Sequence, residues 1–390
     1  MIKKDSSVYQ IKKPKSNNVK KKTIPVNKPI FLGNEAKYLD KCIKTGWIGS
    51  DGEYVKKFEK NFSRYIGKRF GVAVSSGTAA LDIAFTALKL QKGDEVILPT
   101  FTIISCLNPI LKVGAKPVFI DADLKTWNMD VNEIEKNITK KTKIILAVHI
   151  YGLPVDMLKL MRIAKRNNIK VIEDTAEQIG QNIYNKKCGS FGDISTFSFY
   201  TNKHITTGEG GMILTNNKLL NQRSLKLRNL FFENKRRFVH REIGWNYRMS
   251  NLQAAVGLAQ LENIKKLIKL KRKFGNLYFH ILKKISGIDI QSYKTKYSQN
   301  IYWVIGLVIK EKNKIDKVRK YLNKKGIQTR PFFFPLHKQP LYKKTNNKKF
   351  KLPNSEYLSR NGFYLPSGLG LKISEIKYVC AKLKYILSQK

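Results

Sequence analysis

Residues 195–211 read Ser-Thr-Phe-Ser-Phe-Tyr-Thr-Asn-Lys-His-Ile-Thr-Thr-Gly-Glu-Gly-Gly, and the rest of the sequence is interpreted outward from them. Phe197 and Phe199 alternate with polar side chains, which is the period of a half-buried strand. A glycine-rich turn follows, and residues 212–214 predict a second apolar strand. Lys203 lies just beyond the first strand, where a partly dry pocket would lower its pKa and allow a Schiff base. Solvated surface charge is the alternative interpretation, because the chain has 75 lysine and arginine residues.

Short apolar segments that alternate with helical patterns precede this stretch. Five of them are predicted strands, at residues 70–74, 95–98, 117–120, 144–148 and 170–173. Strands that alternate with helices favour a mostly parallel sheet covered on both faces, with ligands bound at the carboxyl ends of the strands. The predicted fold class is therefore α/β, with a large domain built on a mostly parallel mixed sheet and a smaller α+β C-terminal domain.

Two polar segments follow strands at the predicted edge of the sheet. Ser76, Gly77 and Thr78 stand between the first strand and a helix. Free N–H groups at such a helix start can hold a phosphate, although small residues also simply cap helices. Asp174 follows the fifth strand, where an acid either caps the next helix or takes part in chemistry. We expect it at the same edge as Lys203, because the carboxyl ends of parallel strands lie together.

The chain divides into a short head and two domains. Residues 1–28 are lysine-rich and show no apolar periodicity, so we expect a flexible basic head. Residues 29–265 are predicted to form the large domain. Residues 266–390 are predicted to form the smaller one, which includes a strand expected at residues 302–309.

Composition limits the classes of protein to which the chain can belong. Hydrophobic residues make up 42% of the 390 residues, which is ordinary for a folded soluble protein with a large core. No run of about 18 apolar residues occurs, and the amino terminus lacks the apolar region of a signal peptide. The cysteines and the five histidines are scattered, so we expect reduced thiols, a cytoplasmic location and no metal site.

The formal net charge of +47 has two interpretations. It can attract nucleic acid or a phosphorylated substrate, or it can reflect lysines spread over solvated faces. Outside the head, the basic residues are distributed over helices and are not gathered into one stripe interleaved with aromatic residues. This distribution favours solvated faces and argues against a nucleic-acid partner.

A lysine for a Schiff base, an acid for a ring nitrogen and a phosphate cradle are together what pyridoxal 5'-phosphate requires. Over about residues 25–385, the sequence resembles the fold-type I sugar aminotransferases of the DegT/DnrJ/EryC1/StrS family. The resemblance rests on Gly46-Trp47 with Gly52, Ser76-Gly77-Thr78-Ala79-Ala80-Leu81, Pro99-Thr100-Phe101-Thr102, Glu173-Asp174-Thr175-Ala176-Glu177, Ser198 with Lys203 and Gly208-Glu209-Gly210-Gly211, and Asn246-Tyr247-Arg248-Met249-Ser250.

This resemblance implies an aspartate aminotransferase-like fold, pyridoxal 5'-phosphate as cofactor, and catalysis by two residues. Lys203 would form the Schiff base and shuttle protons, and Asp174 would pair with the ring nitrogen. The backbone of Gly77 and Thr78 and the hydroxyl of Ser198 would hold the phosphate.

Three further positions follow from the same resemblance. Asn246 is implied to reach the phosphate of a neighbouring subunit, so we expect a homodimer with shared active sites. Glu177 is implied to lie near the 3-hydroxyl of the ring, at a position that is often glutamine. Ile103 departs from the family pattern, because many members carry an aromatic side chain there that stacks on the ring.

Within the family, residues 202–211 and 330–337 look most like the perosamine synthases. These enzymes aminate C4 of a GDP-linked 4-keto-6-deoxy sugar, with glutamate as donor. Trp47, Arg330 and His337 are then implied to line the sugar or diphosphate site, with loop packing and surface charge as the alternative.

Several other functions stay open at this point. UDP-sugar 4-aminotransferases and 3-aminotransferases of the same family are closely similar. The 3-dehydratase branch has a histidine in place of the lysine, and the presence of Lys203 argues against it. A basic nucleic-acid-binding protein without catalysis has only the charge in its favour.

Overall fold

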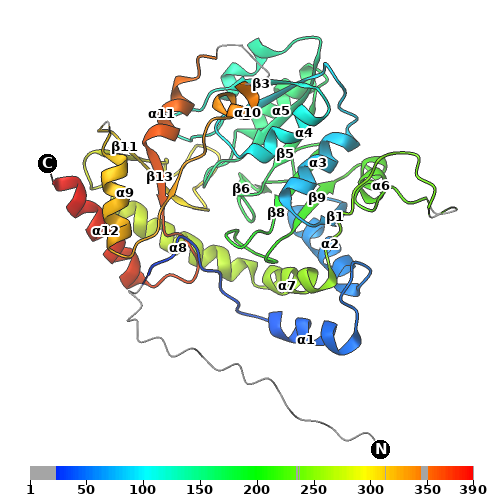
Figure 1. Cartoon of the computed structure of the whole chain (residues 1–390), viewed down its shortest axis with the longest axis horizontal. Coiled ribbons are helices and arrows are strands. Elements are labelled where there is room, and N and C mark those ends of the chain that lie inside the picture. The colour runs from blue at the N-terminus through cyan, green and yellow to red at the C-terminus, as the bar shows by residue number, and fades with distance from the viewer. Residues whose placement is uncertain (1–22, 234–235, 237, 312, 344–349, 390) are drawn as a thin grey trace, which may run out of the picture.

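The computed structural model describes residues 23–389, apart from residues 234–235, 237, 312 and 344–349. These residues form a seven-stranded sheet, a four-stranded sheet and a two-stranded hairpin, with helices around them (Figure 1). In this part of the chain, no helix is both long enough and apolar enough to cross a membrane.

The large sheet confirms the predicted mostly parallel arrangement. Its strands, in spatial order, are β1 (Phe70–Val74), β9 (Gly211–Thr215), β8 (Ile194–Ser198), β5 (Lys170–Asp174), β4 (Thr142–Val148), β2 (Glu95–Pro99) and β3 (Lys116–Ile120). β9 is antiparallel to both of its neighbours, and all other pairs are parallel. Six strands therefore run in one direction, and their carboxyl ends share one edge.

Alternate residues of these strands face two different helical layers. In β4, Ile144, Leu146 and Val148 belong to the apolar core under α3, whereas Ile145 and Ala147 belong to the core under α5. The first layer contains α3 (Gly77–Ala87), α4 (Asn108–Lys112) and α6 (Lys218–Leu227). The second contains α2 (Glu53–Ile66), α5 (Met157–Arg166) and α7 (Asn251–Glu262), with α1 (Glu35–Thr45) packed on α7.

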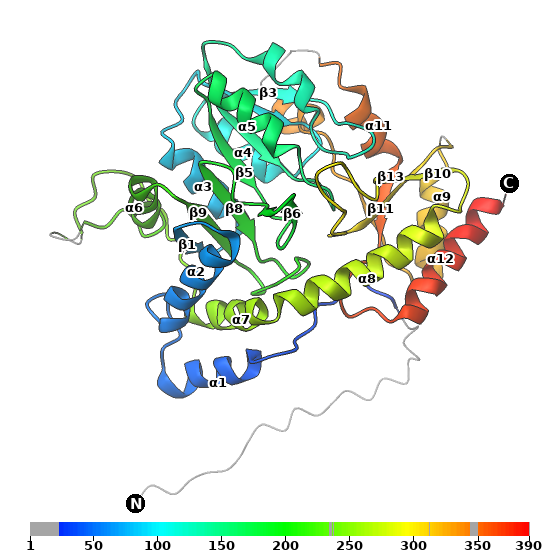
Figure 2. The ribbon, with the colours of Figure 1, turned by 180° about the vertical axis from the view of Figure 1, so that it is seen from behind.

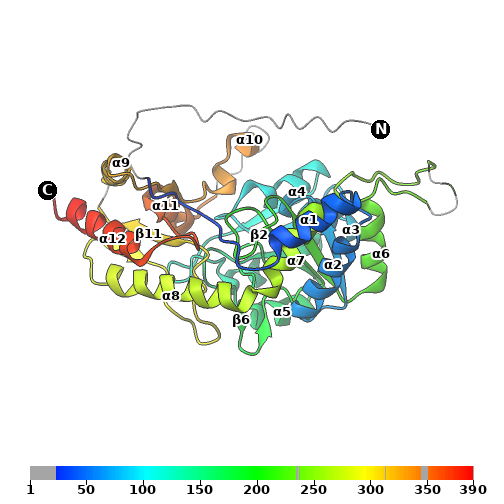
Figure 3. The same ribbon diagram turned by 90° about the horizontal axis from the view of Figure 1, so that it is seen from below.

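The four-stranded sheet is antiparallel and has its own core. Its order is β10 (Ile288–Ile290), β11 (Ile305–Ile309), β13 (Gly362–Leu365) and β12 (Arg330–Pro331). α8 (Ile264–Leu282), α9 (Ile315–Lys324) and α12 (Ile373–Ser388) pack on one face, and α11 (Pro353–Asn361) packs on the other. α7 and α8 follow each other with only Asn263 between them, and α8 extends from the large sheet to the small one (Figures 2 and 3). We propose that the domains predicted at residues 29–265 and 266–390 correspond to these two sheets.

The remaining elements are short. They are β6 (Asn182–Ile183), β7 (Lys186–Lys187), α10 (Pro340–Lys343) and the 3₁₀ helices η1 (Ile104–Cys106), η2 (Val131–Glu133), η3 (Glu135–Asn137) and η4 (Leu336–Lys338).

The prediction of a flexible head at residues 1–28 is wrong for its last residues. Ile24 and Val26 are buried, and the backbone of Ile24 pairs with residues 326–328. The carbonyl oxygen of Val26 accepts a hydrogen bond of 2.8 Å from the N–H of Ser367. Buried apolar side chains and backbone hydrogen bonds together attach this segment. Residues 1–22 lie outside the described residues.

Gly211 offers a test of how closely the large sheet packs against the start of α3. A Cβ atom at Gly211 would overlap the carbonyl group of Ser76, whereas a Cβ atom at Gly49 would meet no atom within 4 Å. We expect Gly211→Ala to destabilise the protein by about 1–3 kcal/mol, because overpacking forces the backbone to shift. Differential scanning calorimetry should show a lower melting temperature than in the matched control Gly49→Ala. Equal melting temperatures would contradict this close packing.

Candidate active site

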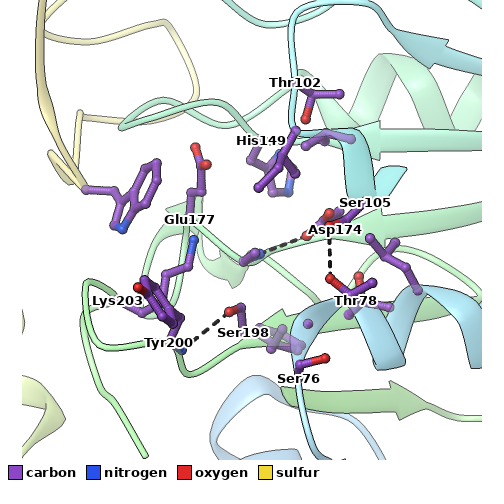
Figure 4. Close-up of a pocket in the computed structure, with 18 of the residues that line it drawn as sticks. Ser76, Thr78, Thr102, Ser105, His149, Asp174, Glu177, Ser198, Tyr200 and Lys203 are labelled. Atoms are coloured by element: carbon purple, nitrogen blue, oxygen red, sulfur yellow. Dashed lines mark hydrogen bonds between the residues drawn. The ribbon is translucent and has the colours of Figure 1, made fainter. Parts of the chain in front are cut away.

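A cavity of about 350 Å³ lies at the carboxyl ends of the parallel strands. It brings together six of the residues singled out from the sequence: Gly77, Thr78, Asp174, Glu177, Ser198 and Lys203. Figure 4 shows Lys203 and Glu177 on one side of it and Asp174 and Thr78 on the other. Segments that are more than 120 residues apart in the chain thus supply a single site, as expected for strand ends that share one edge.

The start of α3 forms a narrow cradle at one end of the cavity. The side chain of Ser76 accepts a hydrogen bond of 3.1 Å from the N–H of Ala79 and caps the helix. Gly77 and Thr78 lie in the first turn of the helix, where no helical carbonyl oxygen lies four residues earlier to accept from their N–H groups. These N–H groups are therefore free to bind an anion at the positive end of the helix. A Cβ atom on Gly77 would lie 2.9 Å from the Cβ atom of Ser198, so only glycine leaves this approach open.

Hydroxyl groups complete the cradle. The Thr78 hydroxyl lies 2.9 Å from that of Ser105, and the Ser198 hydroxyl accepts a hydrogen bond of 3.4 Å from the N–H of Tyr200 (Figure 4). The Thr196 hydroxyl is buried in the cavity wall, with no partner among the described residues. Free N–H groups, hydroxyls and an unpaired buried oxygen fit a phosphorylated polar ring such as the predicted pyridoxal phosphate.

Asp174 is the last residue of β5, and its side chain is almost fully buried. One carboxylate oxygen accepts a hydrogen bond of 3.0 Å from the N–H of Ala176, and the other lies 3.6 Å from the sulfur of Cys106. Burial raises the pKa of the Asp174 carboxyl, while the N–H of Ala176 and the charge of Lys203 act in the opposite direction. A buried carboxylate with few partners is suited to face a protonated ring nitrogen.

Lys203 stands on the loop after β8 and directs its amine into the cavity. Its side-chain Nζ lies 4.0 Å from the centre of the Trp303 ring. The backbone N–H of Lys203 donates a hydrogen bond of 2.9 Å to the carbonyl oxygen of Tyr200. Burial lowers the pKa of the Lys203 amine, although the nearby Glu177 and Asp174 oppose the effect. A lowered pKa increases the fraction of the amine that is neutral, and the neutral amine is the nucleophilic form.

Glu177 is buried in the same wall. Its Oε2 accepts a hydrogen bond of 2.6 Å from the N–H of Tyr151. Burial raises the pKa of its carboxyl to about 8, against the opposing charge of Lys203. At neutral pH the side chain therefore holds a proton in much of the population, and it can donate a hydrogen bond as well as accept one.

His149 also lines the cavity, although it was not among the residues predicted from the sequence. Its Nδ1 accepts a hydrogen bond of 3.1 Å from the N–H of Val155, so the ring proton lies on Nε2 and is donated to Glu173 at 3.2 Å. The signal available in the sequence was its place directly after β4, at the same edge as Asp174. Thr102 and Ser105, which follow β2, carry the same signal.

Aromatic side chains close the opposite side of the cavity. Trp303, Phe333 and Tyr364 come from the segments around the four-stranded sheet, and Tyr200 comes from the lysine loop. Ile103 also lines the cavity and is about half exposed, so an aliphatic side chain stands where the family pattern led us to look for a ring. Trp303 and Tyr364 were not predicted from the sequence, because they lie on no strand end of the large sheet, whereas Phe333 falls within the segment 330–337.

Four residues proposed from the sequence do not line the cavity. Trp47 and Asn246 are exposed, and Arg330 lies on β12, paired with the cavity residue Tyr364. The placement of His337 at the substrate site is not supported. Its side chain is buried, and both ring nitrogens are engaged, by the Thr100 hydroxyl at 2.7 Å and by Glu356 at 3.2 Å.

The chain is similar to known proteins over nearly its whole length. Residues 31–384 match the sequence model of the DegT/DnrJ/EryC1/StrS aminotransferase family. A protein from Escherichia coli O157:H7 named GDP-perosamine synthase is 41% identical over 369 residues, which cover 95% of this chain and all of that protein. A Vibrio cholerae protein of the same name is 39% identical, over 93% of this chain and 98% of that protein.

A solved structure is similar over nearly the whole chain. It is the GDP-4-keto-6-deoxymannose-3-dehydratase ColD, in a variant with asparagine in place of a histidine and with bound GDP-perosamine. The two chains are 26% identical, with a TM-score of 0.86 over 92% of this chain and all of that one.

The raised pKa of Glu177 predicts a pH dependence of stability. In the unfolded chain this carboxyl loses its proton near its ordinary pKa of 4.5, but in the folded chain it keeps the proton until about pH 8. Its contribution to the free energy of unfolding is therefore present below about pH 4.5 and is lost as the pH rises through about 8. Glu177→Gln keeps an acceptor for the N–H of Tyr151 but cannot titrate.

We expect the melting temperature of the cofactor-free protein to fall less between about pH 5 and about pH 8 in Glu177→Gln than in the wild type. Glu135→Gln, at an exposed glutamate, is the matched control and should keep the wild-type slope. Thermal melts across this range check the difference. A Glu177→Gln slope equal to the wild-type slope would contradict the assignment.

Proposed function

Because this chain belongs to the DegT/DnrJ/EryC1/StrS aminotransferase family, we propose that it transfers an amino group from glutamate to C4 of a GDP-linked 4-keto-6-deoxy sugar. The chain is a pyridoxal-phosphate-dependent sugar aminotransferase, and its substrate is a nucleotide-linked sugar. The GDP group and the C4 position are supported by the names of the relatives at 41% and 39% identity. Within the chain, the observation that carries the proposal is the amine of Lys203 in the same cavity as Asp174.

When bound, pyridoxal phosphate supplies an electron-withdrawing ring, which makes a C–H bond next to the amino nitrogen acidic. The N–H groups of Gly77 and Thr78 and the hydroxyl of Ser198 hold its phosphate at the positive end of α3. Asp174, which is buried and lines the cavity, would hold the ring nitrogen and favour a proton on it. Glu177 would bind the 3-hydroxyl, as donor or as acceptor, because burial raises the pKa of its carboxyl to about 8.

Lys203 has two tasks in this scheme. Its amine would hold the cofactor in the cavity, and it would move a proton at the reacting carbon of the substrate. Both tasks need a neutral amine, which burial favours. The aromatic side chains Trp303, Phe333 and Tyr364 keep bulk water from the reacting atoms. Arg330, on β12, pairs with Tyr364 on β13 and supplies a positive charge for the diphosphate.

A homodimer with shared active sites accounts for the exposed residues of the family pattern. Asn246 and Trp47 face outward from this chain, so they serve a site only in an assembly. Large apolar side chains are also exposed nearby in the sequence: Phe31, Leu32, Ile43, Ile48, Phe238, Val239 and Ile243. A second copy of the chain would remove such side chains from water.

The proposed reaction is tested by mixing the purified holoprotein with glutamate and GDP-4-keto-6-deoxymannose, and in parallel with UDP- and dTDP-linked 4-keto-6-deoxy sugars. We expect an amino group at C4 of the GDP-linked sugar, identified by mass spectrometry and NMR. Lys203→Ala should lower turnover by roughly 10²-fold or more, because proton transfer by the lysine is lost. The exposed Lys377→Ala should keep it.

Borohydride reduction and peptide mapping should find the cofactor attached to Lys203 alone. Attachment to another lysine would refute the role of Lys203. A product formed only from a UDP-linked sugar, or aminated at C3, would instead replace the proposed substrate.

The shared site is tested by mixing two inactive variants, Lys203→Ala and Asn246→Ala. A mixed dimer has one site with an intact lysine from one subunit and an intact asparagine from the other. Random pairing should therefore restore about a quarter of the wild-type activity. Sedimentation velocity of each variant verifies that dimers form. If dimers form and exchange subunits, but no activity returns, Asn246 does not serve the neighbouring site.

A further inference from the structure

Cys106 has a buried thiol that contacts a residue of the proposed cofactor site. The proposed function gives this thiol no role. It ends the 3₁₀ helix η1, after β2, and its side chain has no exposure to solvent. Its sulfur lies 3.6 Å from Oδ2 of Asp174 and 3.6 Å from the hydroxyl of Thr102. The other three cysteines make no such contact with a residue of the cavity: Cys42 lies against Asn251, and Cys188 and Cys380 pack in apolar cores.

The direction of these hydrogen bonds follows from the chemistry of the groups. A charged carboxylate can only accept, so the thiol donates its hydrogen to Asp174. The hydroxyl of Thr102, which lines the cavity, is then the donor to the sulfur. Burial and the neighbouring Asp174 raise the pKa of the Cys106 thiol well above its ordinary value, so the thiol keeps the hydrogen that it donates.

This bond matters because Asp174 has few other partners. Its Oδ1 accepts from the N–H of Ala176, and the thiol is the side-chain donor to its Oδ2. The charged or titratable groups that face the carboxylate are Lys203, His149 and Glu177. A buried carboxylate that loses a donor bears the desolvation cost of the unpaired oxygen, which disfavours its charged form.

We propose that Cys106 is a positioning residue for Asp174, and that its thiol hydrogen orients the carboxylate that faces the ring nitrogen and favours its charged form. The inference rests on the role of Asp174 in the proposed function. It does not depend on which sugar or nucleotide the enzyme uses. Cys106 does not itself line the cavity, so it acts through Asp174.

Three substitutions separate hydrogen bonding from packing. Cys106→Ser keeps a donor of similar size, Cys106→Ala removes the donor, and Cys106→Val removes the donor but fills the space. We expect the dissociation constant for pyridoxal phosphate to rise roughly three- to ten-fold in Cys106→Ala and Cys106→Val, the effect of losing one hydrogen bond. Cys106→Ser should stay within about two-fold of the wild type. The control Cys380→Ala, at another buried thiol, should not change it.

A second readout uses the cofactor-free protein. In a variant with Cys42, Cys188 and Cys380 replaced by alanine, the infrared S–H stretching band belongs to Cys106 alone. We expect this band at the low frequency of a hydrogen-bonded thiol, and we expect it to move to higher frequency in Asp174→Asn, because a neutral amide is a weaker acceptor. Both measurements need no sugar substrate, so their outcome is separate from that of the amination assay.

Two outcomes would overturn the proposal. One is an S–H band that does not move in Asp174→Asn. The other is a wild-type dissociation constant for pyridoxal phosphate in Cys106→Val together with a raised one in Cys106→Ser. Packing alone, without the hydrogen bond, would predict this result.

Discussion

The parallel pairing of β5 with β8 determines where the polar groups of the cavity lie. Its register sets Asp174 opposite Thr196, and the chain then needs only a short loop after β8 to bring Lys203 back over the same edge. β9 returns antiparallel beside β8, and its Gly211 packs against the backbone at the start of α3. The acid, the amine and the anion cradle are thus fixed relative to one another by backbone hydrogen bonds.

The strand period also separates two adjacent carboxylates that have different tasks. Glu173 points away from the cavity and accepts hydrogen bonds from His149 and from the N–H groups of Gly189, Phe191 and Gly192. Burial alone would raise the pKa of Glu173, but these donors lower it. Asp174 points into the cavity, and within the described part of the chain only Ala176 and Cys106 donate to its carboxylate. Glu173 therefore holds the loop at residues 189–192 before β8, whereas the carboxylate of Asp174 can still accept a hydrogen bond from a ligand.

The sequence predicted those parts of the fold and the site that depend on strand ends. The five apolar segments before residue 174 all form strands, and Gly77, Asp174 and Lys203 meet as expected, because parallel strands bring their carboxyl ends to one edge. The side of the cavity formed by residues in and beside the four-stranded sheet could not be predicted this way. The strand expected at residues 302–309 begins only at Ile305, because Tyr302 has a positive φ of 58°, and this turn directs Trp303 to the cavity.

His337 looked like a binding residue in sequence but is engaged in tertiary hydrogen bonds that no local pattern reveals.

The indole of Trp303 has a consequence for how such an enzyme can be divided or recombined. Its Nε1 donates a hydrogen bond of 3.0 Å to the carbonyl oxygen of Asn202, the residue before the lysine, and its ring covers the amine. A fragment that carried only the seven-stranded sheet would leave that amine facing water, where an ordinary ammonium ion is favoured. The surroundings of this amine are therefore a joint property of both halves of the polypeptide, and swapping C-terminal halves between relatives can change them.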